Sequence, residues 1–184
     1  MSKMKLLFVS LLVLLLMTGC SVIGTSNRQA EMKLLQPVDG PSPVLLTQRV
    51  TLDSWGQQQQ FIAIGRFTYA QTQLVALLPT GQQLLSLEFD GQELTQRAAA
   101  SIELPGHDIL ALIQFALWPD DTLQRSYRAE QGWTVALADD HRQLSYNGKL
   151  WLDVEYTGQQ VNIDNQLAGY RVIIETLEQK ELRP

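Results

Sequence analysis

Apolar and polar residues alternate along most of the chain after residue 43. The alternation is clearest in residues 149–157, where Leu152, Val154 and Tyr156 fall on one side of an extended chain and charged residues fall on the other. A period of two is typical of a strand that buries one face and exposes the other. Trp151 interrupts the polar side of this strand, and we expect it to be an exposed aromatic residue.

Ten segments of this kind predict ten strands. They are residues 44–52, 60–69, 73–78, 83–89, 92–97, 133–138, 142–147, 149–157, 160–164 and 169–177. Short turns separate neighbouring strands, among them Asp90-Gly91 and Asn147-Gly148, and such pairs suit two-residue hairpins because glycine accepts a positive φ. Connections this short indicate an antiparallel meander, because parallel strands need a longer crossover.

One segment between the strands differs. Residues 108–118 are apolar almost all round, with Gln114 as the lone polar residue within the run, and Pro119 follows. Length, composition and the proline predict a helix that ends before Pro119. Asp120 and the two residues after it are expected to cap a further short helix that ends at Ser126.

A helix that is apolar on all sides must be buried on most of them. We therefore expect the sheet to curve around residues 108–118. The predicted fold is mainly β, within the α+β class. It consists of a curved antiparallel sheet or half-barrel of about ten strands that encloses one apolar helix.

The start of the chain has the features of an export signal. Lys3 and Lys5 precede an apolar run over residues 6–17, which is too short to predict a membrane span. The small residues Thr18 and Gly19 then lead directly to Cys20, which is the only cysteine. An ordinary signal peptide with a chance cysteine and an uncleaved N-terminal helix are the alternative interpretations.

This junction resembles the lipobox of bacterial lipoproteins, in which small residues precede an acylated cysteine. The resemblance implies that residues 1–19 are a cleaved signal peptide and that a diacylglycerol is joined to the sulfur of Cys20. It further implies anchoring at the periplasmic face of the outer membrane, because Ser21 stands where an aspartate favours retention in the inner membrane. Two or three acyl chains form a stable anchor.

Residues 20–43 are rich in serine, glycine and proline, and we expect a lipidated tether there. Within it, a short helix over residues 28–35 and a disordered spacer both remain open. Residues 44–184 are expected to form a single domain, long enough to bury its own core.

Composition narrows the possible functions. The chain is 45% hydrophobic and 18% charged, with a net charge of −5 and no basic cluster, so nucleic acid binding is not expected. A single cysteine allows no internal disulfide. His107 and His141 are the only histidines and show no metal-ligand spacing, so we expect neither a metal nor a cofactor.

Three local motifs accompany this arrangement of strands and helix. They are Ile64-Gly65-Arg66-Phe67, Leu78-Pro79-Thr80-Gly81-Gln82 and Leu117-Trp118-Pro119-Asp120-Asp121-Thr122. Over residues 44–165 the chain resembles the LolB family of outer-membrane lipoprotein receptors, whose periplasmic carrier partner is LolA. The resemblance implies an apolar half-barrel that holds acyl chains, and a LolA-like carrier as a possible partner.

Two further motifs resemble a family of proteobacterial lipoproteins that are often encoded beside aryl polyene synthesis genes. They are Gly81-Gln82-Gln83-Leu84-Leu85-Ser86-Leu87 and Gly169-Tyr170-Arg171-Val172. No activity established for that family can be carried over. Together the two resemblances imply an acyl or polyene lipid as the possible cargo.

The turn at Pro79, Thr80 and Gly81 departs from the LolB pattern. LolB has an exposed leucine at this loop tip, thought to help deliver lipid to the membrane, and Thr80 occupies that position here. A polar tip lacks the apolar wedge. We therefore expect that transfer of cargo into a bilayer is weakened even if binding survives.

Six residues are candidates for lining a ligand cavity. They are Phe67, Leu112, Phe115, Trp118, Leu152 and Tyr156. The same side chains can instead fill a solid core, as is usual in small β-folds. The first alternative makes the protein a carrier or acceptor of hydrophobic cargo, and the second makes it a scaffold that binds a protein partner.

We find no pattern of residues in the sequence that predicts a catalytic site. Asp120 and Asp121 are expected to cap a helix, and the run from Asp139 to His141 is expected to form a hairpin turn. Ser86 and Ser145 lie in strand patterns without a Gly-x-Ser-x-Gly elbow. A hydrolase is therefore the least favoured hypothesis, and we do not expect an enzyme.

Overall fold

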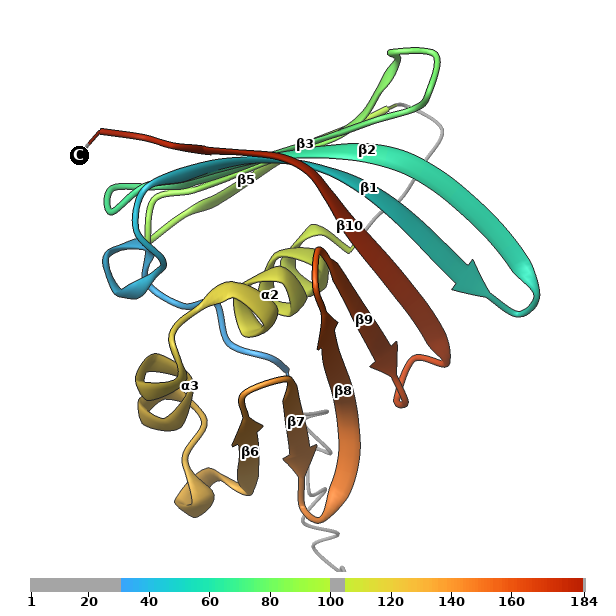
Figure 1. Cartoon of the computed structure of the whole chain (residues 1–184). Helices are drawn as coiled ribbons and strands as arrows, with labels where there is room; N and C mark the ends of the chain where they lie inside the picture. The colour runs from blue at the N-terminus through green and yellow to red at the C-terminus, as the bar shows by residue number, and fades with distance from the viewer. Residues whose placement is uncertain (1–30, 100–104, 184) are drawn as a thin grey trace, which may run out of the picture.

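The computed structural model describes residues 31–99 and 105–183. In these residues ten antiparallel strands form one sheet, in the order β5-β4-β3-β2-β1-β10-β9-β8-β7-β6 (Figure 1). The strands are β1 (Val44–Ser54), β2 (Gln57–Phe67), β3 (Thr72–Leu77), β4 (Gln83–Phe89), β5 (Leu94–Ala98), β6 (Trp133–Ala138), β7 (His141–Tyr146), β8 (Lys149–Thr157), β9 (Gln160–Asn165) and β10 (Tyr170–Glu181). The predicted ten-stranded antiparallel sheet is confirmed.

The sheet consists of two five-stranded meanders, β1–β5 and β6–β10, that are joined by their outermost members. β1 pairs with β10 along its whole length, from Val44 opposite Glu181 to Ser54 opposite Tyr170. Because the first and last strands meet at the centre, β5 and β6 become the two edges of the sheet. The helices connect these edges and so must cross the open side.

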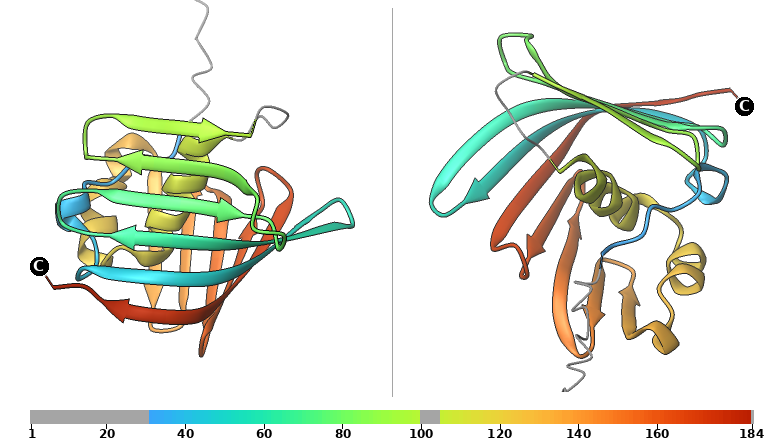
Figure 2. Two further views of the ribbon diagram at one scale, coloured as in Figure 1. Left: turned by 90° about the horizontal axis from the view of Figure 1, so that it is seen from above. Right: turned by 180° about the vertical axis from the view of Figure 1, so that it is seen from behind.

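Two α-helices and two short 3₁₀ turns complete the described structure. The helices are α2 (Gly106–Leu117) and α3 (Asp120–Ser126), and the 3₁₀ turns are η1 (Pro37–Asp39) and η2 (Ala129–Gln131). Figures 1 and 2 show α2 on the concave side of the sheet, between its two halves. This confirms the helix predicted over residues 108–118, apart from shifts at its ends, and the short helix predicted after it.

Alternate residues of the strands form the core beneath α2. In β1 the buried positions are Val44, Leu46, Gln48 and Val50, which all face the concave side. Burying one large aliphatic side chain contributes roughly 1.5–3 kcal/mol. The side chains with the least exposure, at most 2%, include Phe67, Leu85, Leu110, Phe115, Trp118, Leu123, Leu144, Leu152, Val154 and Ile163.

The prediction that Trp151 is exposed is wrong, because a β-bulge changes the alternation in β8. Leu144 lies opposite Leu152 while Ser145 lies opposite Leu150, so Trp151 is an extra residue without a partner in register. A bulge of this kind redirects a side chain. The Trp151 ring is 9% exposed, and it packs edge-on against Trp133 with 5.0 Å between ring centroids.

The described part of the expected tether packs on the domain. Met32 and Leu35 are 8% and 4% exposed and belong to the core, and residues 31–36 form neither helix nor strand. The segment is therefore bound to the domain at these residues rather than hanging free. The predicted signal peptide, residues 1–19, and Cys20 lie outside the described residues.

A charge placed on α2 tests whether its burial holds the domain together. Leu112 is 6% exposed, so Leu112→Asp would bury an unpaired carboxylate. We expect a loss of about 3–5 kcal/mol in the free energy of unfolding, enough to unfold much of the protein at ambient temperature. Urea denaturation followed by circular dichroism measures this.

The matched control is Leu177→Asp. Leu177 is 44% exposed because it is the extra residue of a bulge in β10. Its replacement should change stability by no more than about 0.5 kcal/mol. Equal stability of the two variants would contradict the burial of α2.

Candidate functional site: helix α2 on the concave face

The C-terminal end of α2 is held by an arginine from the sheet. The Nη1 of Arg142, on β7, donates to the carbonyl oxygens of Phe115, Ala116 and Trp118 at 3.0, 3.1 and 2.9 Å. Its Nη2 lies 2.9 Å from a carboxylate oxygen of Asp120. The last carbonyls of a helix have no partners within it and form the negative end of its dipole. Arg142 therefore satisfies these carbonyls and supplies the complementary charge.

A tyrosine from the next strand supports the same helix end. The hydroxyl of Tyr156, on β8, donates to the carbonyl of Ala116 at 2.7 Å. The guanidinium of Arg142 lies 5.4 Å from the centre of the Tyr156 ring, within range of a cation–π contact. Burial raises the pKa of Tyr156 to about 12, with a smaller increase from Asp120 and an opposing effect from Arg142. The phenol is therefore a stable donor at neutral pH.

Gln114 joins the middle of α2 to the N-terminal segment, which we define as residues 31–39. Its side chain is fully buried. The Nε2 atom donates to the carbonyl of Leu35 at 2.8 Å, and the Leu35 amide donates to Oε1 at 2.7 Å. The side-chain amide thus pairs with the backbone of one residue as a neighbouring strand would. This pairing explains why a polar residue is tolerated inside an apolar helix.

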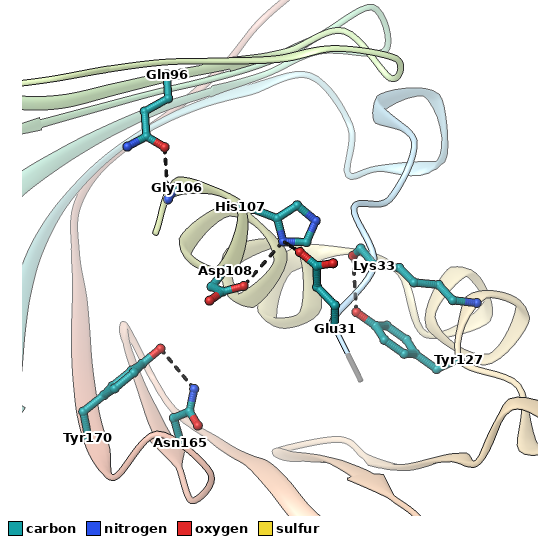
Figure 3. A network of polar contacts seen from close by, with 9 residues as sticks. All are labelled: Glu31, Lys33, Gln96, Gly106, His107, Asp108, Tyr127, Asn165 and Tyr170. Atoms are coloured by element: carbon teal, nitrogen blue, oxygen red, sulfur yellow. Dashed lines mark hydrogen bonds and ion pairs between the residues drawn. The ribbon is translucent and has the colours of Figure 1, made fainter. Parts of the chain in front are cut away.

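Three more side chains from the helical region bind the backbone of the N-terminal segment. The carbonyls of Lys33, Gln36 and Asp39 accept hydrogen bonds from the side chains of Tyr127, Trp118 and Thr122, at 3.4, 3.1 and 3.0 Å. Figure 3 shows the contact between Lys33 and Tyr127. Because these bonds go to backbone oxygens, they place few demands on the sequence of the segment. The periodicity of the sequence does not predict these three hydrogen bonds.

The six candidate ligand-binding residues come together around α2. Phe67 and Trp118 meet edge to face at 6.0 Å between ring centroids. Phe67, Phe115, Trp118 and Leu152 are at most 2% exposed and Leu112 is 6% exposed, while Tyr156 is partly buried. A side chain that lines a space wide enough for an acyl chain would retain accessible surface. In this structure, therefore, α2 itself occupies the concave face.

Two of the hollows on the described surface lie elsewhere, beside α3 and η2. One is lined by residues 124 and 127–131, and the other lies between α3 and the N-terminal segment. Polar and charged side chains such as Lys33, Arg125 and Arg128 dominate their walls, which do not suit an apolar chain. None of the six candidate ligand-binding residues lines either hollow.

The loop tip at Pro79, Thr80 and Gly81 is exposed in the turn between β3 and β4. The Gly81 amide donates to the carbonyl of Leu78 at 2.8 Å, and Gly81 has a φ of +86°. Glycine adopts this backbone conformation without strain. The exposed tip is thus a tight polar turn.

The carboxylates weighed as catalytic groups have structural partners. Asp120 pairs with Arg142, and Asp121 pairs with Arg125 one helical turn later. Asp139 and Asp140 form the turn between β6 and β7, as predicted. A ring nitrogen of His141 contacts a carboxylate oxygen of Asp153 across β7 and β8.

One polar cluster was missed by sequence reasoning. The Nδ1 of His107 lies 3.2 Å from a carboxylate oxygen of Glu31 and 3.4 Å from one of Asp108 (Figure 3). Nothing in the sequence pairs Glu31 with the start of α2. Three potential metal ligands meet here, but structural metal sites usually have four protein ligands. We interpret the cluster as polar contacts that hold Glu31 against α2.

Comparison with known proteins identifies a family. The family model DUF3261, described as a protein of unknown function, matches residues 45–178, and the chain therefore belongs to this family. Among curated proteins none matches the sequence. We expected a lipoprotein family without an established activity. The description of DUF3261 assigns no function, which agrees with the second part of that expectation, and it does not mention a lipoprotein.

Solved structures give a distant similarity. A crystal structure of a domain from Vibrio parahaemolyticus, described as a candidate outer membrane lipoprotein-sorting protein, has 7% sequence identity and a TM-score of 0.38. The alignment covers 76% of this chain and 85% of that domain.

The Arg142 contacts predict a measurable contribution to stability. Arg142→Met would leave the carbonyls of Phe115 and Trp118 without this donor and that of Ala116 with Tyr156 alone, and we expect a loss of about 2–3 kcal/mol in the free energy of unfolding. Tyr156→Phe removes one hydrogen bond and should cost about 1 kcal/mol. Urea denaturation measures both values, and amide hydrogen exchange should locate the loss at the C-terminal turn of α2.

Arg49→Met is the matched control. Arg49 forms an ion pair with Glu175 at 2.8 Å, and its side chain is 44% exposed. An exposed pair of this kind contributes less than about 1 kcal/mol. If Arg49→Met and Arg142→Met lost equal stability, the special role of Arg142 would be refuted.

Proposed function

We propose that this member of the DUF3261 family is a lipid-anchored envelope protein that binds an acylated or otherwise hydrophobic cargo on the concave face of its sheet. One observation carries the proposal. An apolar helix, α2, occupies this face and is fixed there by polar side chains at its end and middle, chiefly Arg142, Tyr156 and Gln114. Its apolar contacts are non-directional, so another apolar chain can replace them.

In the proposed mechanism, cargo takes the place of α2. Moving the helix away would expose apolar side chains of the sheet such as Phe67 and Leu152, at a cost of about 25 cal/mol for each Å² returned to water. An acyl chain laid on the same surface restores this burial. The hydrogen bonds from Arg142 and Tyr156 then determine how readily α2 moves, because cargo does not replace them.

The anchor in this proposal is Cys20. The signal-like residues 1–19 and the small residues before Cys20 support it, and Ser21 favours the outer membrane over the inner. Among residues 31–99 and 105–183, no helix is long and apolar enough to cross a membrane. The partners we propose are the bilayer itself and either a LolA-like carrier or an acyl or polyene lipid.

A second function is favoured by a separate observation. Phe115 and Leu110 have no exposed surface, as expected for a permanently packed core. If α2 never leaves the sheet, the protein acts as a scaffold and binds a protein partner through its outer surface. A hydrolase has less support, because in the described residues no serine hydroxyl is shown to bond to His141, whose contact is with Asp153.

Fatty-acid binding distinguishes carrier from scaffold. A fluorescent fatty acid such as parinaric acid is titrated into the full-length protein and into Arg142→Met. If cargo displaces α2, weakening the Arg142 contacts should tighten binding about tenfold or more, since each 1.4 kcal/mol removed from the opening step is a factor of ten. Arg49→Met should bind as the wild type does.

Each variant must first show a cooperative thermal transition above the assay temperature, so that binding to unfolded chain is excluded. Saturable binding that is tighter in Arg142→Met supports the carrier. Absence of binding in both folded proteins, across fatty acids and lipopeptides, decides for the scaffold.

The anchor has its own test. Cys20→Ser should abolish incorporation of labelled palmitate in cells and leave either precursor or a released soluble form, because the acceptor sulfur is gone. Ser21→Ala keeps that sulfur and should label as the wild type does. Labelling that persists in Cys20→Ser would refute acylation at this residue.

A further inference from the structure

The tip of the β1–β2 hairpin carries a tryptophan in an unusual setting. Trp55 and Gly56 form a two-residue turn with φ values of 52° and 77°, as a type I′ hairpin requires. A positive φ is rare for a bulky residue and is normally taken by asparagine, aspartate or glycine. The Trp55 side chain is 89% exposed, so its packing offsets little of this strain. The fold gives no reason for a tryptophan here.

A second exposed apolar side chain lies on the neighbouring turn. Leu167, between β9 and β10, is 51% exposed. Ser54 pairs with Tyr170 across β1 and β10, which places the two turns side by side at one end of the sheet (Figure 1). The indole nitrogen of Trp55 is only 3.6 Å from the position that a Cβ atom on Gly169 would take. We call Trp55 and Leu167 the rim patch.

The hairpin around the patch bears no charge. Residues 54–60 contain no ionisable side chain, and four consecutive exposed glutamines follow Gly56. The nearest charged residues, Asp53 and Arg171, lie opposite one another on β1 and β10, and Arg171 also pairs with Asp164 at 2.8 Å. The tip can therefore enter a less polar medium without removing an ion from water.

We propose that the rim patch rests in the interfacial layer of a phospholipid bilayer and orients the domain on the membrane. Tryptophan suits this layer, because its ring is apolar while its N–H needs a polar partner. Glutamine amides can bond to headgroups at the same depth. The inference rests on the proposed anchor at Cys20, since one tryptophan and one leucine are too small a surface for stable binding alone.

The length of the N-terminal chain makes such a contact useful. Roughly ten residues separate Cys20 from the first described residue, and they span at most about 35 Å. That reach is comparable to the diameter of a domain of this size. One anchor point does not determine which face of the domain meets the bilayer, and a second contact would fix it. The anchor also keeps the rim patch close to the bilayer and so raises its effective concentration there, which allows a contact of low affinity to form.

Tryptophan quenching by brominated lipid tests the proposal. The mature lipoprotein is reconstituted into phosphatidylcholine vesicles with or without bromine on the upper acyl chain. Of the four tryptophans, Trp118, Trp133 and Trp151 are 1%, 4% and 9% exposed, so contact quenching reports on Trp55. We expect brominated lipid to quench the wild type and to leave the emission of Trp55→Phe unchanged.

Two placements of a new tryptophan in the Trp55→Phe background provide matched controls. Leu167→Trp, on the neighbouring turn, should be quenched. Val38→Trp should not, since Val38 is 64% exposed but lies in η1, at the opposite end of the molecule from the hairpin tip (Figure 1). Quenching of Val38→Trp without quenching of Leu167→Trp would place a different face on the bilayer and overturn the proposal.

Flotation separates the two possible failures. If the protein does not float with the vesicles, the anchor fails and the inference that depends on it fails with it. If the protein floats but Trp55 is unquenched and still accessible to iodide, the anchor stands and only the rim-patch contact is refuted. That result would point to a protein partner for Trp55.

Discussion

Burial of helix α2 is the constraint on which the other features of this fold depend. The helix is apolar on nearly every side, so a flat sheet that covers one face would leave the rest in water. A curved sheet with its two halves on either side of the helix removes this cost. Burial in turn isolates the last carbonyls of α2 from water, and Arg142 and Tyr156 supply the donors that they would otherwise lack.

The two kinds of contact to α2 have different consequences for function. Apolar burial depends on area and not on which groups provide it, which is why the proposed mechanism lets an acyl chain substitute for the helix. Hydrogen bonds from Arg142 to three carbonyls and from Tyr156 to one depend on geometry, and no apolar ligand reproduces them. Whether this protein carries cargo or serves as a scaffold is therefore a question about the strength of a few polar contacts.

The sequence predicted most of the architecture because period-two strands, short glycine turns and one apolar helix are local signals. It failed at Trp151, where a one-residue bulge shifts the alternation that the prediction assumed. It also failed to find the contacts between Gln114 and Leu35 and between His107 and Glu31. Those pairs are far apart in the sequence and use backbone or single side-chain atoms, so no periodic pattern reveals them.

The placement of apolar residues at turns connects the fold to the membrane. Thr80 makes the β3–β4 tip polar, so we expect weakened transfer of cargo into a bilayer at that turn. The most exposed aromatic side chain of the described residues, Trp55, lies instead on the β1–β2 hairpin, whose strand β1 pairs with β10 at the centre of the sheet. The strands of this hairpin also contribute Val50 and Ala63 to the core beneath α2. A membrane contact at Trp55 would thus be attached to the same two strands that shape the concave face, and would hold that face in a fixed orientation to the lipid.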